Sequence, residues 1–300
     1  MESVLLKYPV VTIEGKVLVE SGTIVTPENI HSFLSQKKNN YKKEKILSFK
    51  TIKDDLIHNI NEYPYNNIIT DKDKFEYVIS LMESVSLPIP VLESLYYFKD
   101  NDYHTYIHFL MVFTLTSLLA NEIISDKKFL QENITAGSTH DIGKICIPKK
   151  IIQKSTPLTK LEKSYLKQHT IAGYFLLSYY YGNEYSHIAN IAKDHHERKD
   201  SSGYPFKTKI DNNDLADIVV ICDIFDALIS SRPYRPIPYD IRSAVEEITD
   251  LAENEKINWK VIKALVNFLR KNKLDFEDCE VSREKRGEPP EHNLYGIFSE

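Results

Sequence analysis

Residues 139–144 read Thr-His-Asp-Ile-Gly-Lys and bring a nitrogen ligand, an oxygen ligand and a cation into one short stretch. His140 and Asp141 are adjacent, and Lys144 follows three residues after the aspartate, a spacing that puts both side chains on one face of a helix. A buried salt bridge between Asp141 and Lys144 would explain these residues equally well. The choice between a salt bridge and a site of chemistry depends on where the other histidines fall.

Seven of the ten histidines fall between residues 104 and 196. His104 and His108 are four residues apart, which places both rings on one face of a helix, as in helical metal sites, although two structural histidines would give the same pattern. Asp223 and Asp226 interrupt an apolar stretch, where a carboxylate is costly to bury unless it is paired or binds a metal. Histidine and carboxylate ligands without cysteine suit iron, manganese, zinc or nickel.

The number of candidate ligands exceeds what one ion needs, because one ion takes about four to six ligands. The candidates in motif-like positions are His104, His108, His140, Asp141, His169, His195, His196 and Asp223. Two or more ions are therefore expected. Asp141 is the natural bridge between two ions about 3.5–4 Å apart, and such a pair can activate a water for in-line attack on a phosphodiester. Lys144, Arg232 and Arg235 offer positive charge for the phosphate.

The apolar periodicity predicts a helical body that follows a small extended region. Residues 8–25 alternate around Glu14-Gly15 as in a β-hairpin, and Thr26-Pro27 signals a helix start. Thr159 and Glu162 have the spacing of a capping box. The predicted helices cover residues 52–60, 74–85, 91–98, 103–124, 215–228, 241–251 and 259–269, with one more that carries His169 and one from His187 to Arg198. The fold class is therefore all-α with a short β-hairpin near the start.

The composition excludes several classes of protein. The chain has 300 residues, 42% of them apolar, and a net charge of −5 with both signs mixed, which argues against nucleic acid and anionic membranes as partners. Thr114, Thr116 and Ser117 interrupt the most apolar stretch, so no membrane span is expected. The first residues lack the layout of a signal peptide, and the three scattered cysteines predict no disulfide framework. A cytoplasmic location fits these features best.

The combination of motifs resembles the HD-GYP family, a branch of the HD superfamily of metal-dependent phosphohydrolases whose members degrade cyclic di-GMP. The resemblance covers about residues 100–270, in family order. The matching stretches are His-Asp-Ile-Gly-Lys at 140–144, Gln-His at 168–169, His-His-Glu-Arg at 195–198, Asp-Ser-Ser-Gly-Tyr-Pro at 200–205, Asp-Ile-Phe-Asp-Ala-Leu at 223–228 and Arg-Pro-Tyr-Arg at 232–235.

The resemblance implies three regions and one reaction. It implies an N-terminal domain of unknown role at residues 1–98, an HD-domain helical bundle at 99–275 and a loose C-terminal tail at 276–300. The expected reaction is hydrolysis of cyclic di-GMP to pGpG, GMP or both, by attack of a hydroxide that bridges the metal ions.

Carried over by position, the resemblance also implies roles for individual residues. Two divalent ions would be bound by His108, His140, Asp141, His169, His195, His196 and Asp223, and a third ion could be bound by His104. Iron is the first expectation, with manganese, zinc or nickel as alternatives. Asp141 and Lys144 would be catalytic. Substrate contacts would come from Lys144, Gly203, Tyr204, Pro205, Asp226, Arg232 and Arg235. The Gly203-Tyr204-Pro205 loop could also contact a GGDEF-type diguanylate cyclase, and a homodimer is a further expectation.

The chain departs from the family pattern at a few positions. Thr170, Lys199 and Ser201 replace a common Pro, Trp and Gly, and His104 stands where members with three ions carry a Glu. None of these changes removes a ligand of a two-ion site. Three alternatives stay open from the sequence: a sensor that binds the dinucleotide without cleaving it, a phosphodiesterase for the hybrid cyclic GMP-AMP, and a generic HD-superfamily nucleotidase.

Overall fold

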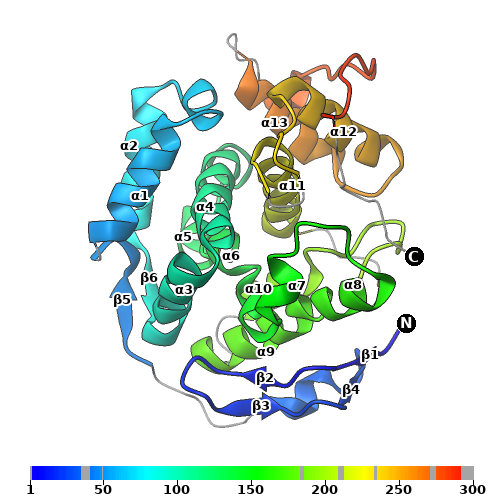
Figure 1. The fold of residues 1–300 in the computed structure, drawn as a ribbon. Coiled ribbons are helices and arrows are strands. Elements are labelled where there is room, and N and C mark those ends of the chain that lie inside the picture. The colour runs from blue at the N-terminus through cyan, green and yellow to red at the C-terminus, as the bar shows by residue number, and fades with distance from the viewer. Residues whose placement is uncertain are drawn as a thin grey trace.

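Helix α4 (Tyr103–Ile123) forms the centre of the protein (Figure 1). The computed structural model describes residues 2–34, 41–48, 50–182, 186–208, 213–232, 235–270 and 275–291. Glu122 is the single acidic or basic residue of α4 apart from its histidines, and the helix is buried over most of its length. A helix that is apolar all round is stable in water only when neighbouring elements cover it on every side. The rest of the helical body is arranged around α4 for this reason.

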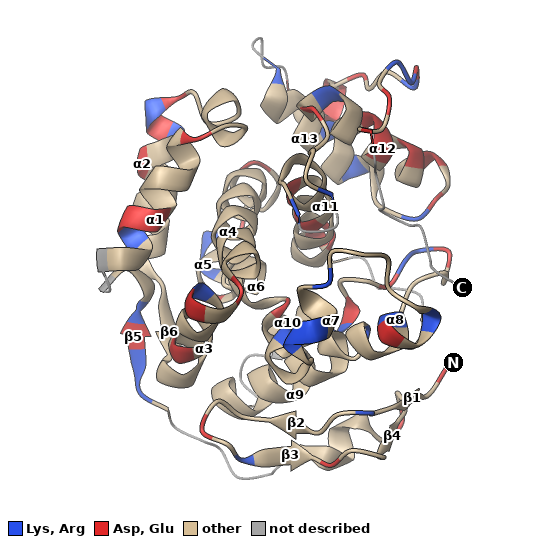
Figure 2. Cartoon of the chain, viewed as in Figure 1, with Lys and Arg blue, Asp and Glu red and all other residues tan. Residues whose placement is uncertain are grey.

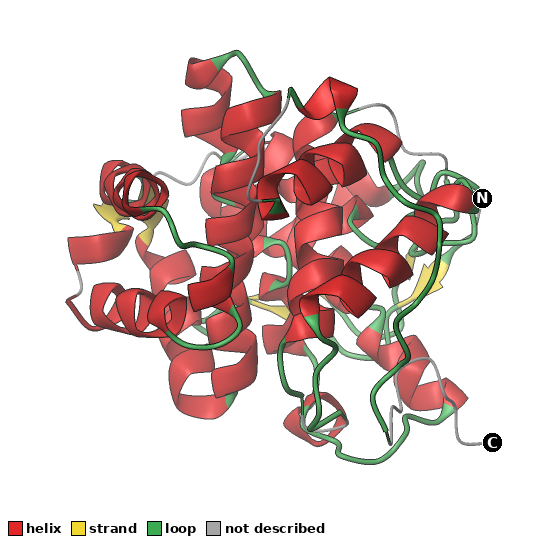
Figure 3. Ribbon diagram, turned by 90° about the horizontal axis from the view of Figure 1, so that it is seen from above, coloured by secondary structure: helices red, strands yellow, loops and turns green. Residues whose placement is uncertain are grey.

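The described elements are mostly helices with a few short strands, which confirms the all-α class (Figure 3). The strands are β1 (Val4–Leu5), β2 (Val10–Val11), β3 (Val17–Val19), β4 (Ile24–Val25), β5 (Lys43–Lys45) and β6 (Ser86–Pro88). The other α-helices are α1 (Lys50–Asn61), α2 (Lys72–Ser84), α3 (Ile89–Asn101), α5 (Lys127–Asn133), α6 (Ala136–Thr139), α7 (Lys149–Ile152), α8 (Lys160–Leu166), α9 (His169–Tyr181), α10 (Ser186–Asp194), α11 (Asp214–Ile229), α12 (Ile241–Glu253) and α13 (Trp259–Leu269). The 3₁₀ helices are Ile30–Phe33, Ile46–Ser48, Tyr65–Asn67, Ile142–Cys146 and Phe276–Asp278.

Helices from distant parts of the sequence cover α4. α1, α2 and α3 pack against it, as do α6, α11 and α13. In Figure 1, α1 and α2 lie on one flank of α4, and α11, α12 and α13 lie on the other. The buried apolar residues from Leu6 to Phe268 form one continuous core. The domain boundary expected after residue 98 therefore falls inside α3 and inside this core.

The strands near the start of the chain confirm the expected hairpin. β2 pairs with β3 in antiparallel register, and the turn between them contains Gly15, whose φ of +87° favours glycine. β1 and β4 form a second antiparallel pair, and β5 pairs with β6. Figure 1 shows β2 and β3 beside α9, where the Ile13 amide donates to the Tyr180 hydroxyl at 2.9 Å. The helix expected after Thr26-Pro27 is only the 3₁₀ helix Ile30–Phe33.

The helices predicted from periodicity are confirmed, with shifts at their ends. α8 begins with the expected capping box, since the Thr159 hydroxyl accepts from the Glu162 amide at 3.1 Å and the Glu162 carboxylate accepts from the Thr159 amide at 2.8 Å. The helix expected from His187 to Arg198 ends earlier, at Asp194. His195 and His196 therefore follow a helix end, where the backbone can turn the two rings toward the same point.

The described part of the C-terminal tail is attached to α12, which corrects the expectation that it is loose. The Glu246 carboxylate accepts from the amides of Arg286 and Gly287 at 2.9 and 2.6 Å, and the Lys285 ammonium lies 2.5 Å from the Glu247 carboxylate. Residues 292–300 of this tail lie outside the described residues.

Charged residues of both signs lie on the outer helices, whereas α4 is almost free of them in Figure 2. By length and composition, α4 is the candidate membrane span among the described residues, but 78% of its apolar window is buried inside the protein. Its apolar sequence is therefore explained by its central place in the core.

Gly143 allows the segment after α6 to lie directly against the start of α9. A Cβ placed on Gly143 would lie 1.9 Å from the His169 carbonyl oxygen and 2.3 Å from the Gly173 amide nitrogen. Both atoms belong to the backbone, so a side chain at residue 143 would force the two segments apart. The absence of a side chain here keeps Asp141 and His169 within reach of each other.

We expect Gly143→Ala to lower the free energy of unfolding by roughly 1–3 kcal/mol, the usual cost of overpacking. Thermal or urea unfolding would measure this loss. The matched control is Gly173→Ala on the facing helix, where a Cβ would meet the Ala192 Cβ at an ordinary 3.4 Å. Equal stability of the two variants would contradict the proposed role of the close approach at Gly143.

Candidate metal centre

Five separate segments deliver the seven candidate ligands to one buried place. His108 lies on the second turn of α4, the His140-Asp141 pair follows α6, and His169 begins α9. His195 and His196 follow α10, and Asp223 lies in the middle of α11. Apart from half-buried His196, these side chains are buried. Because these segments are separate in sequence, only the folded core can assemble the cluster.

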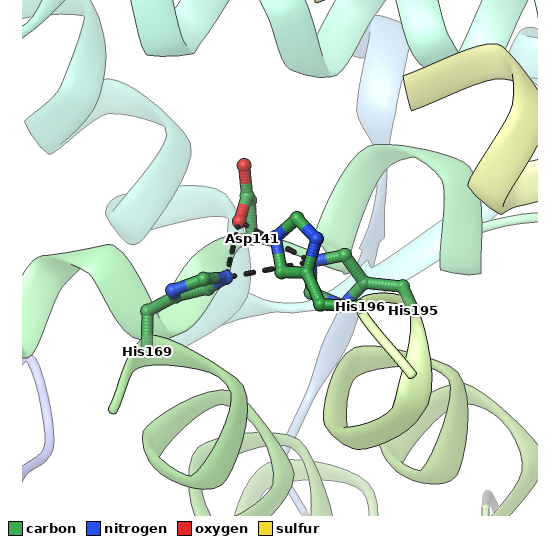
Figure 4. A group of neighbouring side chains, drawn as sticks. All are labelled: Asp141, His169, His195 and His196. Atoms are coloured by element: carbon green, nitrogen blue, oxygen red, sulfur yellow. Dashed lines mark hydrogen bonds and ion pairs between the residues drawn. The ribbon is translucent and has the colours of Figure 1, made fainter. Parts of the chain in front are cut away.

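The carboxylate of Asp141 stands between two groups of ligands. Its Oδ1 atom lies 3.0 Å from His169 Nε2 and 3.6 Å from His195 Nε2 (Figure 4). The Nε2 atoms of these two histidines are 3.4 Å apart, and His196 completes the group. Figure 4 shows the three rings converging on this side of the carboxylate.

The second group faces the other oxygen of the same carboxylate. Asp141 Oδ2 lies 3.7 Å from His108 Nε2 and 3.5 Å from His140 Nε2. Asp223 Oδ1 closes the group, at 3.1 Å from the His108 nitrogen and 3.7 Å from the His140 nitrogen. One carboxylate is therefore shared by two sets of donors, which is the arrangement expected of a bridging ligand.

The ligand atoms of each group lie near the spacing that a common ion requires. Ligand atoms bound to one ion at about 2.0–2.2 Å lie roughly 2.9–3.6 Å from one another in tetrahedral or octahedral geometry. In both groups all ligand atoms lie within 4.8 Å of one another. The donor set of imidazole and carboxylate suits divalent transition metals.

Hydrogen bonds at the far side of the rings decide which nitrogen can bind an ion. Four Nδ1 atoms face groups that accept a hydrogen bond, so each carries the proton and leaves the lone pair on Nε2. The pairs are His108 with Asp226 Oδ2 at 2.5 Å, His140 with Gly137 O at 3.0 Å, His169 with Leu166 O at 2.6 Å and His195 with Ala192 O at 2.9 Å. The buried atoms His140 Nε2 and Asp141 Oδ1 have no hydrogen-bond partner among the described residues. Buried acceptors that face one another in this way fit a bound cation.

The protonation states of these residues also fit metal binding. Burial lowers the pKa of His195 to about 4, and burial together with neighbouring His195 holds the pKa of His196 well below its usual range. Burial opposes ionisation of the Asp141 and Asp223 carboxyl groups, but neighbouring groups outweigh it and hold each pKa well below the usual range. For Asp141 these are Lys144, His140 and His169, and for Asp223 they are His108 and His140. At neutral pH, the neutral imidazoles of His195 and His196 therefore lie beside ionised carboxylates, the forms that bind metal.

Lys144 lies beside the bridging carboxylate, as expected from its spacing. Its ammonium forms an ion pair with Asp141 Oδ2. Burial lowers the pKa of Lys144, but the Asp141 carboxylate outweighs it, so the net shift is upward and the side chain stays charged. The salt bridge considered from the sequence is thus present, but it is one part of a larger cluster and does not explain the five histidines around it.

Asp226 lies behind His108, which corrects its expected role as a substrate contact. The Asp226 side chain is 1% exposed, and its Oδ2 accepts from His108 Nδ1. Arg232 Nη2 donates to the same oxygen at 3.0 Å. Asp226 therefore fixes the ring of a candidate ligand. Arg232, whose side chain is only 10% exposed, holds Asp226 in place through an ion pair.

Arg235 is a second correction, because the structure places it at a helix end and not at the ligand cluster. The residue is fully buried, and its guanidinium donates to the carbonyl oxygens of Ala227, Leu228 and Ser230. These carbonyls lie at the C-terminal end of α11, where carbonyl groups have no intrahelical hydrogen-bond donor. A cation at this end also interacts favourably with the helix dipole. The expected phosphate contact is not supported from this position.

The Gly203-Tyr204-Pro205 loop lies against the backbone and ring of His196. Gly203 is buried so closely that a Cβ would lie 2.4 Å from the His196 carbonyl oxygen, and Pro205 is buried as well. The half-buried Tyr204 ring stacks on the His196 ring with centroids 4.6 Å apart. Gly203 and Pro205 thus support a candidate ligand, and a contact with substrate or a partner stays a prediction for Tyr204 alone.

His104 does not join the cluster. It lies on the first turn of α4, is exposed, and belongs to neither of the two described ligand groups. The i, i+4 spacing correctly places it on the same side of α4 as His108, but the cluster is built one turn deeper. The described residues therefore form two candidate ion positions. His104 does not contribute to either of them, so the described part of the chain gives no evidence for the expected third ion.

The sequence analysis missed Tyr65 and gave Gln168, though part of a matching stretch, no role. The Tyr65 hydroxyl donates to Asp226 Oδ1 from a region far outside the recognised motifs. Gln168, next to His169, holds β1 through the Lys7 amide at 2.9 Å and the Leu5 carbonyl at 3.2 Å. Gln168 could have been found as a buried amide beside a ligand, whereas no local signal marks Tyr65.

The site lies within a recognised family domain. Residues 110–261 match the family model described as HD domain. The chain belongs to the HD domain family. A cyclic di-GMP phosphodiesterase of Thermotoga maritima is 35% identical over 206 residues, which cover 68% of this chain and 53% of that protein. A cyclic di-GMP phosphodiesterase of Pseudomonas aeruginosa is 32% identical over 58% of this chain and 42% of its own length.

A third relative carries a different name. The 3'3'-cGAMP-specific phosphodiesterase 1 of Vibrio cholerae is 33% identical over 132 residues, which cover 44% of this chain and 30% of that protein. The chain thus spans about half the length, or less, of the curated relatives it matches. These similarities confirm the expected resemblance to this family of phosphodiesterases.

We expect the two halves of the HD-domain site to lose metal at different pH. Burial lowers the pKa of His108, but the Asp226 carboxylate outweighs it, so the net shift is upward and a proton competes with the ion at a higher pH than for an ordinary imidazole. His195, with a pKa of about 4, meets no such competition until far lower pH. The number of Mn²⁺ ions bound per chain, measured by equilibrium dialysis at fixed free Mn²⁺, should therefore fall from two to one as the pH is lowered from 8 to about 5.5. Loss of both ions at the same pH would contradict this assignment. It would also be contradicted if metal binding by His108→Gln showed the same pH dependence as binding by the parent protein.

We expect Arg235→Met in this HD domain to lower the free energy of unfolding by roughly 2 kcal/mol or more, because buried carbonyls at the end of α11 lose a charged donor. Urea unfolding measures the loss. Arg242→Met is the matched control, since the Arg242 side chain is 60% exposed and its i, i+4 pair with Glu246 is worth only a few tenths of a kcal/mol. An Arg235→Met variant as stable as the parent would show that the guanidinium is not needed at the helix end.

Proposed function

We propose that the chain is a metal-dependent phosphodiesterase that hydrolyses cyclic di-GMP to pGpG, GMP or both. The observation that carries this proposal is the position of Asp141, each of whose oxygens faces its own set of ligands. When bound, a pair of divalent ions supplies Lewis acidity for a phosphodiester and a water of lowered pKa for its in-line displacement. Burial of the ligands excludes bulk water and strengthens these electrostatic effects.

The metal is proposed from the chemistry of the ligands. Imidazole and carboxylate groups without a thiolate suit iron, manganese, zinc or nickel, and the resemblance to HD-GYP proteins favours iron among them. His108, His140, Asp141 and Asp223 would hold one ion. The second would be held by Asp141, His169, His195 and His196. Free thiols at Cys146, Cys222 and Cys279 are in keeping with a reducing cytoplasm.

Lys144 is the residue proposed to act on the scissile phosphate. Its ammonium reaches Asp141 and stays protonated, so it can hold a phosphate oxygen whose charge grows during the reaction.

Cyclic GMP-AMP is the second candidate substrate, because a similar protein of Vibrio cholerae is specific for 3'3'-cGAMP by name. The ligand cluster acts on a phosphodiester in either dinucleotide and does not distinguish the bases. We favour cyclic di-GMP because two relatives that match 68% and 58% of this chain are named for it.

The proposal is tested by turnover after anaerobic loading with Fe²⁺ or Mn²⁺. We expect cyclic di-GMP to be consumed faster than 3'3'-cGAMP, with pGpG or GMP as product by chromatography. Asp141→Asn, which removes the charge of the bridge, should give no product above a metal-free blank. Tight binding without product would support a sensor, and turnover of 3'3'-cGAMP alone would reassign the substrate.

We expect Lys144→Ala to lower kcat by roughly 10²-fold, because that is the usual effect of removing one hydrogen-bond donor to a developing oxyanion. The variant should still bind both ions. Steady-state kinetics and elemental analysis on the same sample check both parts. Exposed Lys150→Ala is the control for loss of a nearby charge. If Lys144→Ala instead loses metal and regains full rate when metal is added, Lys144 only balances the charge of the cluster.

A further inference from the structure

Tyr65 connects the N-terminal part of the chain to the candidate metal centre. It begins the 3₁₀ helix Tyr65–Asn67, which lies between α1 and α2 in the sequence and outside the residues that match the HD domain. Its side chain is 4% exposed, and its hydroxyl donates to Asp226 Oδ1 across 161 residues of sequence. Such a contact requires α1 and α2 to be docked on the helical body.

The second oxygen of Asp226 continues the chain of hydrogen bonds to a candidate ligand. Asp226 Oδ2 accepts from His108 Nδ1 at 2.5 Å, while His108 Nε2 faces Asp141 and Asp223. Ser230 Oγ also donates to Asp226 Oδ1, at 3.2 Å. Each oxygen of this buried carboxylate is therefore held, and the carboxylate in turn fixes the ring and the tautomer of His108.

The direction of these hydrogen bonds is fixed by the protonation of the phenol. Burial, and then the Asp226 charge, raise the pKa of Tyr65 well above its usual range, so the hydroxyl keeps its proton and acts as a donor. Groups that hold a ligating histidine from behind set its orientation and basicity, and their loss commonly weakens metal binding about 10–100-fold.

We propose that Tyr65 is a positioning residue for the metal centre, acting on His108 through Asp226, so that this one hydrogen bond from the α1–α2 region sets the affinity of the ion held by His108, His140 and Asp223. This inference rests on the metal centre proposed above. It gives the N-terminal region a role in the site without any contact with substrate.

The chain offers a matched control for loss of a buried tyrosine hydroxyl at the same interface. Tyr106 of α4 is fully buried, and its hydroxyl donates to Asp55 Oδ2 of α1 at 2.8 Å. Tyr65 and Tyr106 both join a phenol to a carboxylate between the N-terminal region and the helical body. Asp55 pairs with Lys99 and not with a candidate ligand.

The experiment measures the affinity of the full chain for Mn²⁺ by competition with a chelating indicator, together with thermal unfolding of the metal-free protein. Tyr65→Phe should lower the affinity for one of the two ions by roughly tenfold, while Tyr106→Phe should bind both ions with the affinity of the parent. In an Asp226→Asn background, Tyr65→Phe should have no further effect on affinity, because its path to His108 is already broken. Ser230→Ala should give a smaller loss in the same direction, which keeps the test usable if Tyr65→Phe fails to fold.

Two results would overturn the inference: parental affinity in Tyr65→Phe, or an equal loss in Tyr106→Phe, which would mark a general effect of destabilising the interface. A parent protein that binds no Mn²⁺ would instead defeat the proposed metal centre itself. The two failures are therefore distinguishable within one series of titrations.

Discussion

The ionised carboxylate of Asp141 at the centre of a helical core is the constraint on which the rest of the structure depends. A buried charge is costly unless opposite charges or metal ions surround it. Here the compensation comes from both sides, with His169 and His195 facing one oxygen and His108 and His140 facing the other. The fold can then be understood as the set of contacts that brings these groups to one carboxylate.

Those contacts are made by backbone as much as by side chains. Gly143 lets the Asp141 segment touch the start of α9, and Gly203 lets its loop lie against the backbone of His196. Carbonyls of the preceding turn orient three of the rings, while Asp226 orients the fourth. The ligands are therefore held in position by the protein itself, as preorganised metal binding requires.

The sequence predicted which side chains gather at the cluster, because their pattern is local: His140 beside Asp141, His195 beside His196, and Asp223 in an apolar helix. It failed where the direction of a side chain decides its role. Arg235 and Asp226 have residue types suited to phosphate contacts or ligation, yet the turn after α11 and the packing of α4 point them into the interior. His104 shares a face with His108 but lies one turn nearer the helix end, where it is exposed. Tyr65 could not be predicted, since its contact depends on docking of segments 161 residues apart.

The central claim is that one carboxylate bridges two ions, and a crystal structure of the Mn²⁺-loaded protein with anomalous scattering data tests it most directly. The account predicts two anomalous peaks about 3.5–4 Å apart, one beside each oxygen of Asp141. The first should be bound by His108, His140 and Asp223, and the second by His169, His195 and His196. A single peak, or two peaks of which only one contacts Asp141, would contradict the account.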